Sequence, residues 1–432
     1  MRRSASQWPR TPLRRDSEMS DIIIKEGETI RLGTVDGNLR VGKNARIEAE
    51  SGRKIVVAGI AQFEGRVTID CDFECQEMRL EGRGWGPGGD VAVNGDLEVH
   101  ESADLNASVR VAGGIVAGDL DIGGHLKSGP VKSRRVRVGG HLETEGTLAS
   151  GDVDVGGHMT VRDGVALSNL RVGGHAKIGG GTISGETRVR GHLTTVKPLT
   201  FGSMQVYGHV ILPAGSSGAR LVALGKVVFE GDANCSELDV IGDAKINGGC
   251  NSEDVEVKGG MEVKRDMRVT GKFRVFGTAG IRGTIDCGAL GVSGKLEAER
   301  IKADEKVDIV GEVNTTRGAK SVSVAVGKGS RVTGPLIGDQ VVIGKEMDFG
   351  SAWGLPWWRN ALGRTTNVED VYGSSVKIGL NSRARRVFGD AVELESGAMA
   401  EEVSYTKALK LANDYHLTNP PAKIAKLPDR PF

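Results

Sequence analysis

The stretch VGGHMTVRDGVALSNLRVGGHAKIGGGTISGETRVRGHLTTVK, residues 155–197, decides the fold. A glycine followed by a histidine recurs in it every 17 residues, at Gly157, Gly174 and Gly191. The same glycine continues in both directions, with one step of 16, one of 18 and every other step of 17, at Gly124, Gly140, Gly157, Gly174, Gly191, Gly208, Gly225, Gly242, Gly259, Gly277, Gly294 and Gly311. A fixed period of this length is typical of proteins built from stacked repeats.

Four columns of this repeat are apolar and predict its buried face. In the repeat around Gly157 they are Val153, Val155, Met159 and Val161. Within each pair the two residues lie two apart, which is the spacing of a strand with one buried face. A unit of short strands and glycine bends cannot bury its apolar face alone, but stacked copies can. We therefore predict an all-β fold, a parallel β-helix solenoid with about 17 residues per turn.

The period divides the chain into five regions. We expect a main β-helix over residues 21–349, and further β-helix rungs over 367–416, where Val371, Val387 and Val403 follow in steps of 16. Between them, residues 350–366 form a Trp-rich interruption. Residues 1–20 are basic and without period, and residues 417–432 are rich in proline, so both are expected to be disordered tails.

Charge and cysteine content limit the partners and the compartment. The 57 Lys and Arg nearly balance the 56 Asp and Glu, so no overall field attracts nucleic acid and we expect no nucleic-acid partner. The five cysteines form no CxxC pair and are odd in number, which favours a reducing compartment over a disulfide framework. The sequence shows no apolar signal segment and no run of about 18 apolar residues. The expected location is cytoplasmic, free or peripheral to the cytoplasmic membrane.

Six of the eight histidines occupy one column of the repeat, directly after the anchor glycine: His125, His141, His158, His175, His192 and His209. The next residue of the repeat faces inward, so the imidazoles are expected to face solvent in a ladder with steps of about 4.8 Å. Such a ladder is a candidate site for a divalent metal or for pH sensing, because neighbouring imidazolium ions repel. A stacked polar face is the simpler interpretation, since the column continues as Lys226, Asp243 and Gly260, and we expect no metal site.

The period breaks at FGSAWGLPWWRNALGRTT, residues 349–366. Tryptophan with arginine is typical of a loop that contacts a membrane interface or another protein. The candidate contact residues are Trp353, Leu355, Trp357, Trp358 and Arg359. An aromatic plug over the end of the core is an equally good interpretation.

No motif for catalysis or nucleotide binding stands out from the repeat. The sequence lacks a GxxxxGK[ST] phosphate loop, a GxSxG elbow and an HExxH zinc motif. Cys71 and Cys75 are two thiols without a nearby histidine, which is more typical of structural cysteines than of a metal or redox pair. We therefore expect a protein that is not an enzyme, with no catalytic residues, no cofactor and no nucleotide.

The repeats resemble those of the bactofilins, a family of polymer-forming cytoskeletal proteins. The resemblance rests on VNGDLEV (93–99), VGGHMTV (155–161) and VKGGMEV (257–263), on VEDVYGSSVKIGLNSRARRVFGDAVELESGAMAEEVSY (368–405), and on the Pro-rich ending PPAKIAKLPDRPF. It implies a right-handed β-helix with disordered tails that polymerises end to end without nucleotide and lies on the inner membrane face. The implied partner is a second copy of the same chain, as a homopolymer.

Two other classes of protein stay open. A long solenoid with closed ends would be a monomeric scaffold subunit rather than a filament. The second alternative is a β-helix enzyme, either a hexapeptide acyltransferase or a carbohydrate-active protein. The hexapeptide class has an 18-residue turn of three sixes, whereas the step here is 17.

Overall fold

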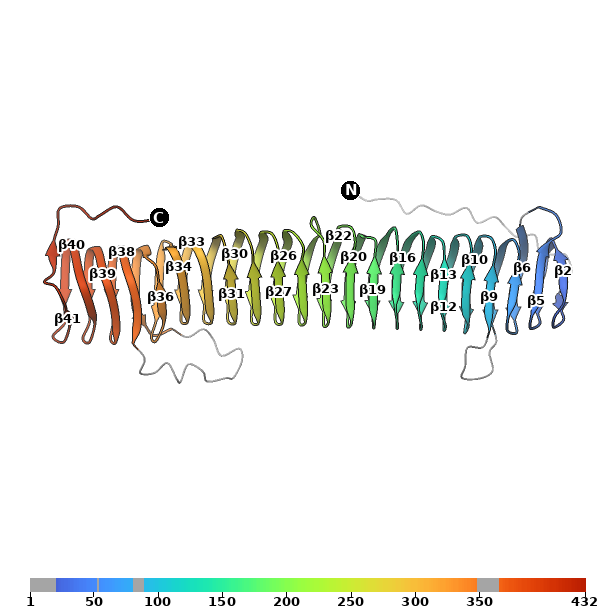
Figure 1. Cartoon of the computed structure of the whole chain (residues 1–432), viewed down its shortest axis with the longest axis horizontal. Helices are drawn as coiled ribbons and strands as arrows, with labels where there is room; N and C mark the ends of the chain where they lie inside the picture. The colour runs from blue at the N-terminus through green and yellow to red at the C-terminus, as the bar shows by residue number, and fades with distance from the viewer. Residues whose placement is uncertain (1–20, 53, 81–88, 348–364) are drawn as a thin grey trace. The chain divides into compact units, whose positions relative to one another are not determined.

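The computed structural model describes residues 21–52, 54–80, 89–347 and 365–432, and these contain β-strands and no helix. The chain consists of two compact units, Met1–Gly139 and Gly140–Phe432. In each unit parallel strands follow one another as the turns of a solenoid, each turn being called a rung below (Figure 1). The predicted all-β parallel solenoid with a period of about 17 residues is confirmed.

The first unit contains the strands β1 (Ile22–Ile24), β2 (Thr29–Leu32), β3 (Thr34–Val35), β4 (Leu39–Val41), β5 (Ala45–Ala49), β6 (Lys54–Phe63), β7 (Val67–Ile69), β8 (Asp72–Leu80), β9 (Asp90–Val93), β10 (Leu97–Leu105), β11 (Ser108–Val111), β12 (Ile115–Ile122), β13 (Leu126–Ser128) and β14 (Val131–Val138).

The second unit contains β15 (Leu142–Thr144), β16 (Thr147–Val155), β17 (Met159–Val161), β18 (Gly164–Val172), β19 (His175–Ile178), β20 (Gly181–Val189), β21 (His192–Thr195), β22 (Leu199–Val206), β23 (His209–Leu212), β24 (Ser217–Ala223), β25 (Lys226–Phe229), β26 (Ala233–Val240), β27 (Asp243–Ile246), β28 (Cys250–Val257), β29 (Gly260–Val263), β30 (Met267–Val275), β31 (Thr278–Ile281), β32 (Thr284–Val292), β33 (Lys295–Ile309), β34 (Glu312–Lys320), β35 (Ser323–Gly327), β36 (Arg331–Thr333), β37 (Leu336–Lys345), β38 (Thr366–Ile378), β39 (Ser382–Leu394), β40 (Met399–Leu411), β41 (His416–Leu417) and β42 (Ala422–Lys423).

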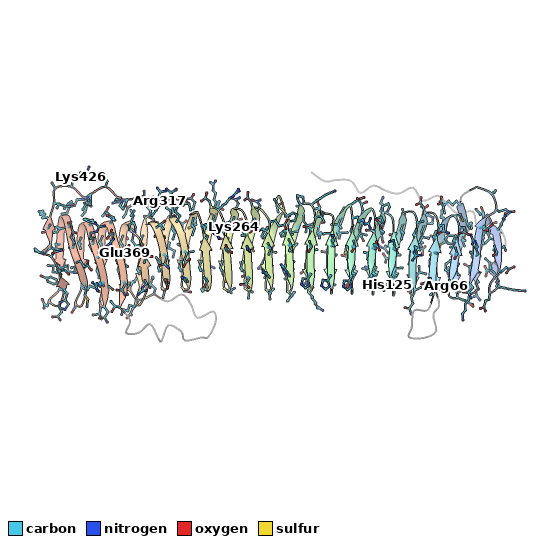
Figure 2. All side chains as sticks on the ribbon, in the orientation of Figure 1. Arg66, His125, Lys264, Arg317, Glu369 and Lys426 are labelled. Atoms are coloured by element: carbon cyan, nitrogen blue, oxygen red, sulfur yellow. The ribbon has the colours of Figure 1, made fainter. Side chains whose placement is uncertain are left out.

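Each strand pairs with the strand at the same place in the next rung. In the second unit β16 pairs with β18, which places Val155 beside Val172, and β17 pairs with β19, which places Met159 beside Ala176. The first unit follows the same scheme, for example where β10 pairs with β12. Side chains at matching positions therefore stack in columns along each solenoid, and charged side chains such as the labelled Lys264 and Arg317 stand on the outside (Figure 2).

The core is formed by the columns that face inward. All four columns predicted from the sequence are buried, as Val153, Val155, Met159 and Val161 illustrate. Two further inward columns were not predicted from the sequence, because their residues vary widely in size. In the second unit they contain Leu148, Val165, Leu199, Ala233, Cys250, Met267, Ile285 and Ile301, and Ser150, Leu167, Ile183, Phe201, Cys235, Ser252, Val269, Cys287 and Ala303.

The anchor glycines mark a corner where successive rungs touch backbone to backbone. A Cβ at Gly208 would lie 1.9 Å from the carbonyl oxygen of Gly191, and one at Gly294 would lie 1.9 Å from that of Gly277. No side chain fits at such a distance, so the period of glycine follows from the close stacking of this corner.

The last rungs of the second unit are built from longer strands. The strands β38, β39 and β40 are 13 residues each and align Val371, Val387 and Val403 at an offset of 16, which changes to 17 between β39 and β40 from Ala391 onward. On the outer side of the same strands, the rings of Tyr372 and Phe388 stack with their centroids 4.9 Å apart. The strand β38 also pairs with β37, so the ladder continues across the gap in the description at residues 348–364.

The C-terminal segment differs from the expected disordered tail. Its strand β42 pairs with β40, and Leu427 and Phe432 pack against a cluster formed by Ile337, Tyr372 and Phe388. The physical reason is that these three side chains lie on the outer side of the strands, where without cover they would expose a contiguous apolar patch. The other expected tail, residues 1–20, lies outside the described residues.

Candidate functional site

The histidine column lies on the outside, as expected. In the second unit the rings of His141, His158, His175 and His192 stack in parallel, with centroids 4.7, 5.0 and 4.6 Å apart and planes within 2° of each other. The ring of His209 is tilted by 60° from that of His192 and lies 5.8 Å away. His125 belongs to the first unit, where it is exposed.

Parallel stacking determines what this column can bind. The nitrogen lone pairs lie in the planes of the rings, so rings stacked face to face point their lone pairs side by side rather than toward a common centre. Among the described residues, no group of three or more His, Cys, Asp or Glu side chains is placed to hold a metal ion. Burial lowers the pKa of His209, and the neighbouring Lys226 and His192 lower it further. Because the rings are stacked in parallel, the column presents their nitrogen-bearing edges to solvent as a row of hydrogen-bonding groups.

The first rung of the first unit is an unpaired sheet edge within the described residues. Its strands β1, β2 and β3 pair only with β4, β5 and β6 of the second and third rungs. The N–H of Ile22 donates to the carbonyl of Asn38, and the carbonyl of Ile24 accepts from the N–H of Gly42, at 2.9 Å each. Because parallel strands bond alternately to either side, the peptide N–H of Ile23 points away from the second rung. The side chain of Ile23 is 70% exposed.

The last rung of the second unit is partly covered. The strand β40 pairs on its outer side with β41, through Met399 and Ala400, and with β42, through Ser404 and Tyr405. Its remaining stretch, residues 408–411, has no outer partner among the described residues, and Leu409 and Leu411 in it stay half-buried. Sequence reasoning pointed to the end rungs as the places of assembly but did not identify these strands, because an edge strand has the same amino-acid pattern as a strand in any other rung.

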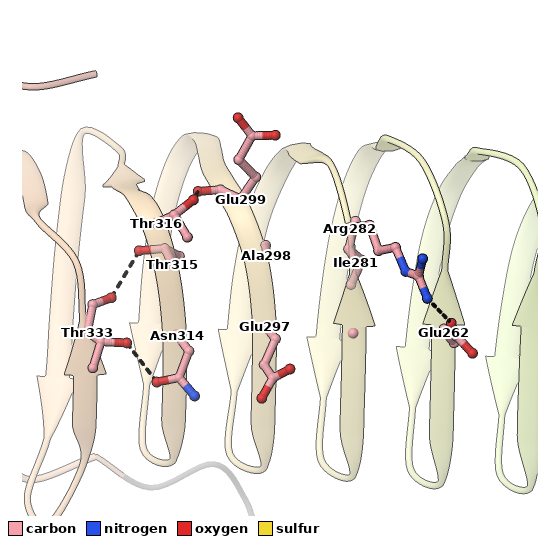
Figure 3. Close-up of a pocket in the computed structure, with 11 residues that line it drawn as sticks. Glu262, Ile281, Arg282, Glu297, Ala298, Glu299, Asn314, Thr315, Thr316 and Thr333 are labelled. Carbon is pink, nitrogen blue, oxygen red and sulfur yellow. Dashed lines mark hydrogen bonds and ion pairs between the residues drawn. The ribbon is translucent and has the colours of Figure 1, made fainter.

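A groove of about 710 Å³ runs along the outside of the second unit (Figure 3). One side of it is the column Glu262, Gly280, Glu297 and Asn314, in which Gly280 leaves a notch where a Cβ would meet nothing within 4 Å. The carboxylate of Glu262 is 3.4 Å from Arg282, and that of Glu297 is 2.7 Å from Lys295. Its lining also includes Thr315, Thr316 and Thr333, whose hydroxyls donate to the carbonyl of Thr333, the carbonyl of Glu299 and the side-chain oxygen of Asn314.

The five cysteines are buried and free. Burial raises the pKa of the Cys75 and Cys235 thiols to about 12 and that of Cys71 to about 11, with nearby carboxylates adding to the effect at Cys71 and Cys75. A thiol is the weak form of the nucleophile and ligand, so this environment matches the structural interpretation of Cys71 and Cys75.

The Trp-rich contact candidates Trp353, Leu355, Trp357, Trp358 and Arg359 lie outside the described residues. Within the part of the chain that the structure describes, no helix is long and apolar enough to cross a membrane.

Comparisons with protein-family models, with curated proteins and with solved structures gave no match to this chain.

Proposed function

We propose that this chain is a non-enzymatic structural protein that joins copies of itself through the ends of its solenoid into filaments or scaffolds, in the manner of the bactofilins that its repeats resemble. The observation that carries the proposal is the open edge formed by β1, β2 and β3, which pair on one side only within the described residues. A strand edge with free N–H and C=O groups is a ready template for pairing with another chain.

The assembly proposed here uses no nucleotide. Strand pairing between rungs forms hydrogen bonds and buries apolar side chains, and neither process needs a hydrolysis step. The exposed Ile23 on the first rung supports this, because an apolar side chain at the edge gains burial when a further rung covers it.

The experiment is sedimentation and negative-stain electron microscopy of the purified full chain, with and without ATP or GTP and over a range of salt. The proposal expects pelleting filaments or sheets whose amount does not depend on nucleotide. Uniform single particles under all conditions would favour the monomeric scaffold or enzyme readings instead.

The proposal places the protein in the cytoplasm, with attachment to the membrane through Trp353, Trp357 and Trp358. Replacing these three tryptophans by serine is expected to reduce pelleting with anionic vesicles while leaving filaments intact. Unchanged vesicle pelleting of the triple variant would remove this segment from the proposal without touching the assembly itself.

A further inference from the structure

Three neighbouring rungs of the second unit carry an apolar patch on their outer surface. It consists of Tyr207, Ile211, Val222, Leu224, Val228 and Ile241, and we call it the central patch. Tyr207, Leu224 and Ile241 are 51%, 39% and 38% exposed, and the other three are half-buried. In the same columns, other rungs carry polar or charged residues such as Arg188, Lys177 and Glu256.

The register shows that the central patch is continuous. Tyr207, Leu224 and Ile241 follow each other at one corner, because the N–H of Leu224 donates to the carbonyl of Val206 and that of Ile241 to the carbonyl of Ala223, each at 2.9 Å. On the next face of the solenoid Ile211 pairs with Val228. The rung of residues 222–228 lies in the middle, with one rung on either side.

Charge changes sign across this middle rung. The four rungs up to it, residues 164–229, carry seven Lys and Arg against a single acid, Glu186. The next stretch, residues 230–257, carries eight Asp and Glu against a single base, Lys245. The whole chain has a net charge of only +1, so this is a local dipole along the solenoid with the central patch at its midpoint.

We infer that the central patch is a lateral contact between two copies of this chain, related by a two-fold axis that lies across the rung of Leu224. In such an antiparallel pair each column faces the same column of the other copy, and the order of the rungs is reversed. The basic rungs of one copy then face the acidic rungs of the other. The contact is independent of the ends and adds a sideways association to the end-to-end assembly proposed above.

Most residues that meet in this arrangement are complementary; the exceptions are Lys226, which meets itself, and Arg190, which meets Lys258. Leu224 meets Leu224 of the second copy, and Tyr207 meets its Ile241. One column over, Gln205 faces Asp239 and Arg188 faces Glu256, because these residues stack in one column at equal distances from Val222.

The histidine column takes part in the same contact. His209 and Asp243 lie one rung to either side of Lys226, so they face each other across the pair. Lys226 itself lies on the axis, where its long side chain reaches Asp243 of the other copy. Arg190 faces Lys258, whose ammonium is already bound by Glu256 at 2.6 Å.

A second copy fits this surface better than a linear polyanion does. A nucleic acid or acidic glycan would gain from the basic rungs, but it would be repelled by the eight acids that follow directly. With rungs about 4.8 Å apart, the five rungs involved give a face of about 20 by 20 Å. This is about half the area per partner of a stable dimer, so the contact is weak for single chains and gains strength when many copies are aligned.

Cysteine cross-linking tests the contact in the full chain, because the five native thiols are buried. Mild oxidation to a disulfide, which joins only thiols whose Cα atoms lie within about 7 Å, is expected to link Leu224→Cys to itself. Tyr207→Cys and Ile241→Cys should each link poorly alone and efficiently when mixed. The matched control is Val196→Cys, which is 59% exposed at another corner of the solenoid. Efficient linking of Tyr207→Cys alone would overturn the antiparallel register, and equal yields for Leu224→Cys and Val196→Cys would overturn the contact.

Charge reversal provides a second test in the Leu224→Cys background. Arg188→Glu alone and Glu256→Arg alone each place like charges opposite each other in a symmetric pair, so each is expected to lower the cross-linking yield severalfold. A mixture of the two variants restores both opposite-charge pairs and should recover the yield. A mixture that stays as low as the single variants contradicts the facing assigned here.

The outcome is separable from that of the proposed function. Cross-linking of Leu224→Cys in a sample without filaments would support the lateral contact and count against assembly through the ends. Filaments whose Leu224→Cys yield equals that of the control would support the ends and overturn the lateral contact. Loss of Leu224→Cys cross-linking on adding single-stranded DNA, with a stable protein–DNA complex in its place, would identify the surface as a polyanion site and also overturn it.

Discussion

The regular rungs of the second unit and its last three rungs stack on their neighbours through different contacts. In the regular rungs a corner glycine lets the backbones touch, and the outward columns are mostly polar. In the last rungs, 13-residue strands carry specific outward contacts, namely the stacked rings of Tyr372 and Phe388 and the ion pairs of Asp370. The comparison teaches that an interior rung needs only to fit its neighbours, whereas the last rungs are held together by specific contacts and covered by the C-terminal segment.

The largest stability effect is expected at the glycine corner of the regular rungs. Gly294→Ala would place a Cβ 1.9 Å from a backbone oxygen, and we expect it to lower the free energy of unfolding of the surrounding rungs by about 3 kcal/mol. Gly280→Ala is the matched control, because a Cβ there meets nothing within 4 Å, and it should change stability by less than about 0.5 kcal/mol. Hydrogen exchange of β31 and β33 measures both. Equal effects of the two variants would refute the close-contact explanation.

The next largest effect concerns the ion pairs of the last rungs. The side chain of Asp370 is 8% exposed and accepts from Arg385 at 3.0 Å and also from Arg386. Asp370→Asn removes the carboxylate that Arg385 and Arg386 share, while Arg385 keeps Glu369 at 3.9 Å. We expect a loss of about 2 kcal/mol, less than for a fully buried pair because both guanidinium groups are half-exposed. Urea unfolding monitored in β38 to β40 measures the loss. No change at pH 7 would contradict the assignment.

The same carboxylate predicts a pH dependence. Burial alone would raise the pKa of Asp370, but the bonds from Arg386 and Arg385 outweigh it and hold the pKa below its ordinary value. A carboxyl whose pKa is lower in the folded than in the unfolded state stabilises the fold above the unfolded pKa, which is about 3.9. The difference between the wild type and Asp370→Asn should therefore be constant above about pH 5 and shrink as the pH falls through the folded pKa.

A smaller effect is expected from uncovering the last rungs. Leu427 and Phe432 pack on the Tyr372 cluster, and the ring of Phe432 lies 5.2 Å from the guanidinium of Arg300. Leu427→Ala with Phe432→Ala should lower the stability of β38 and β39 by about 1 to 2 kcal/mol through lost burial and a lost cation–π contact. Leu380→Ala, at a residue that is 47% exposed, is the control for removing an apolar side chain and should have little effect. Thermal unfolding compares the two, and similar shifts in Tm would mean that the segment adds no stability.

The smallest effect is expected in the histidine column of the regular rungs. Because burial and the neighbouring Lys226 and His192 lower the pKa of His209, the unfolded state takes up a proton at a higher pH than the folded state. Stability should therefore fall as the pH drops through about 6.5 toward the folded pKa. His209→Gln is expected to remove this part of the pH dependence between pH 7 and 5. Denaturation curves at both pH values measure it, with the exposed His158→Gln as control, and an unaltered pH dependence would contradict it.

Much of the fold could be predicted from the sequence, and the limits have physical causes. The glycine corner and the four apolar columns recur because every rung makes the same backbone contact. They are therefore visible in the sequence as residues at a fixed spacing. The two further inward columns were not predicted, because a small residue in one rung lies beside a large residue in the next. An example is Gly218, which lies against the ring of Phe201. The cover by Leu427 and Phe432 was missed because it is a single contact without a period.

The candidate sites were less predictable than the fold. The outward orientation of the histidines followed from strand alternation, but their parallel stacking depends on side-chain rotamers that the sequence does not specify. The edge strands and the central patch depend on which rungs are neighbours and which rung is first. Those facts become visible only when the columns are stacked in register.

The most direct test of the central claim is electron microscopy of a variant that blocks the open edge without disturbing the first rung. Ile23→Pro removes an N–H that points away from the second rung, and proline is tolerated at such a position of an edge strand. The account predicts filaments from the wild type and from Ile23→Ala, which keeps the N–H, and separate particles from Ile23→Pro. Filaments of unchanged length from folded Ile23→Pro would contradict assembly through this edge.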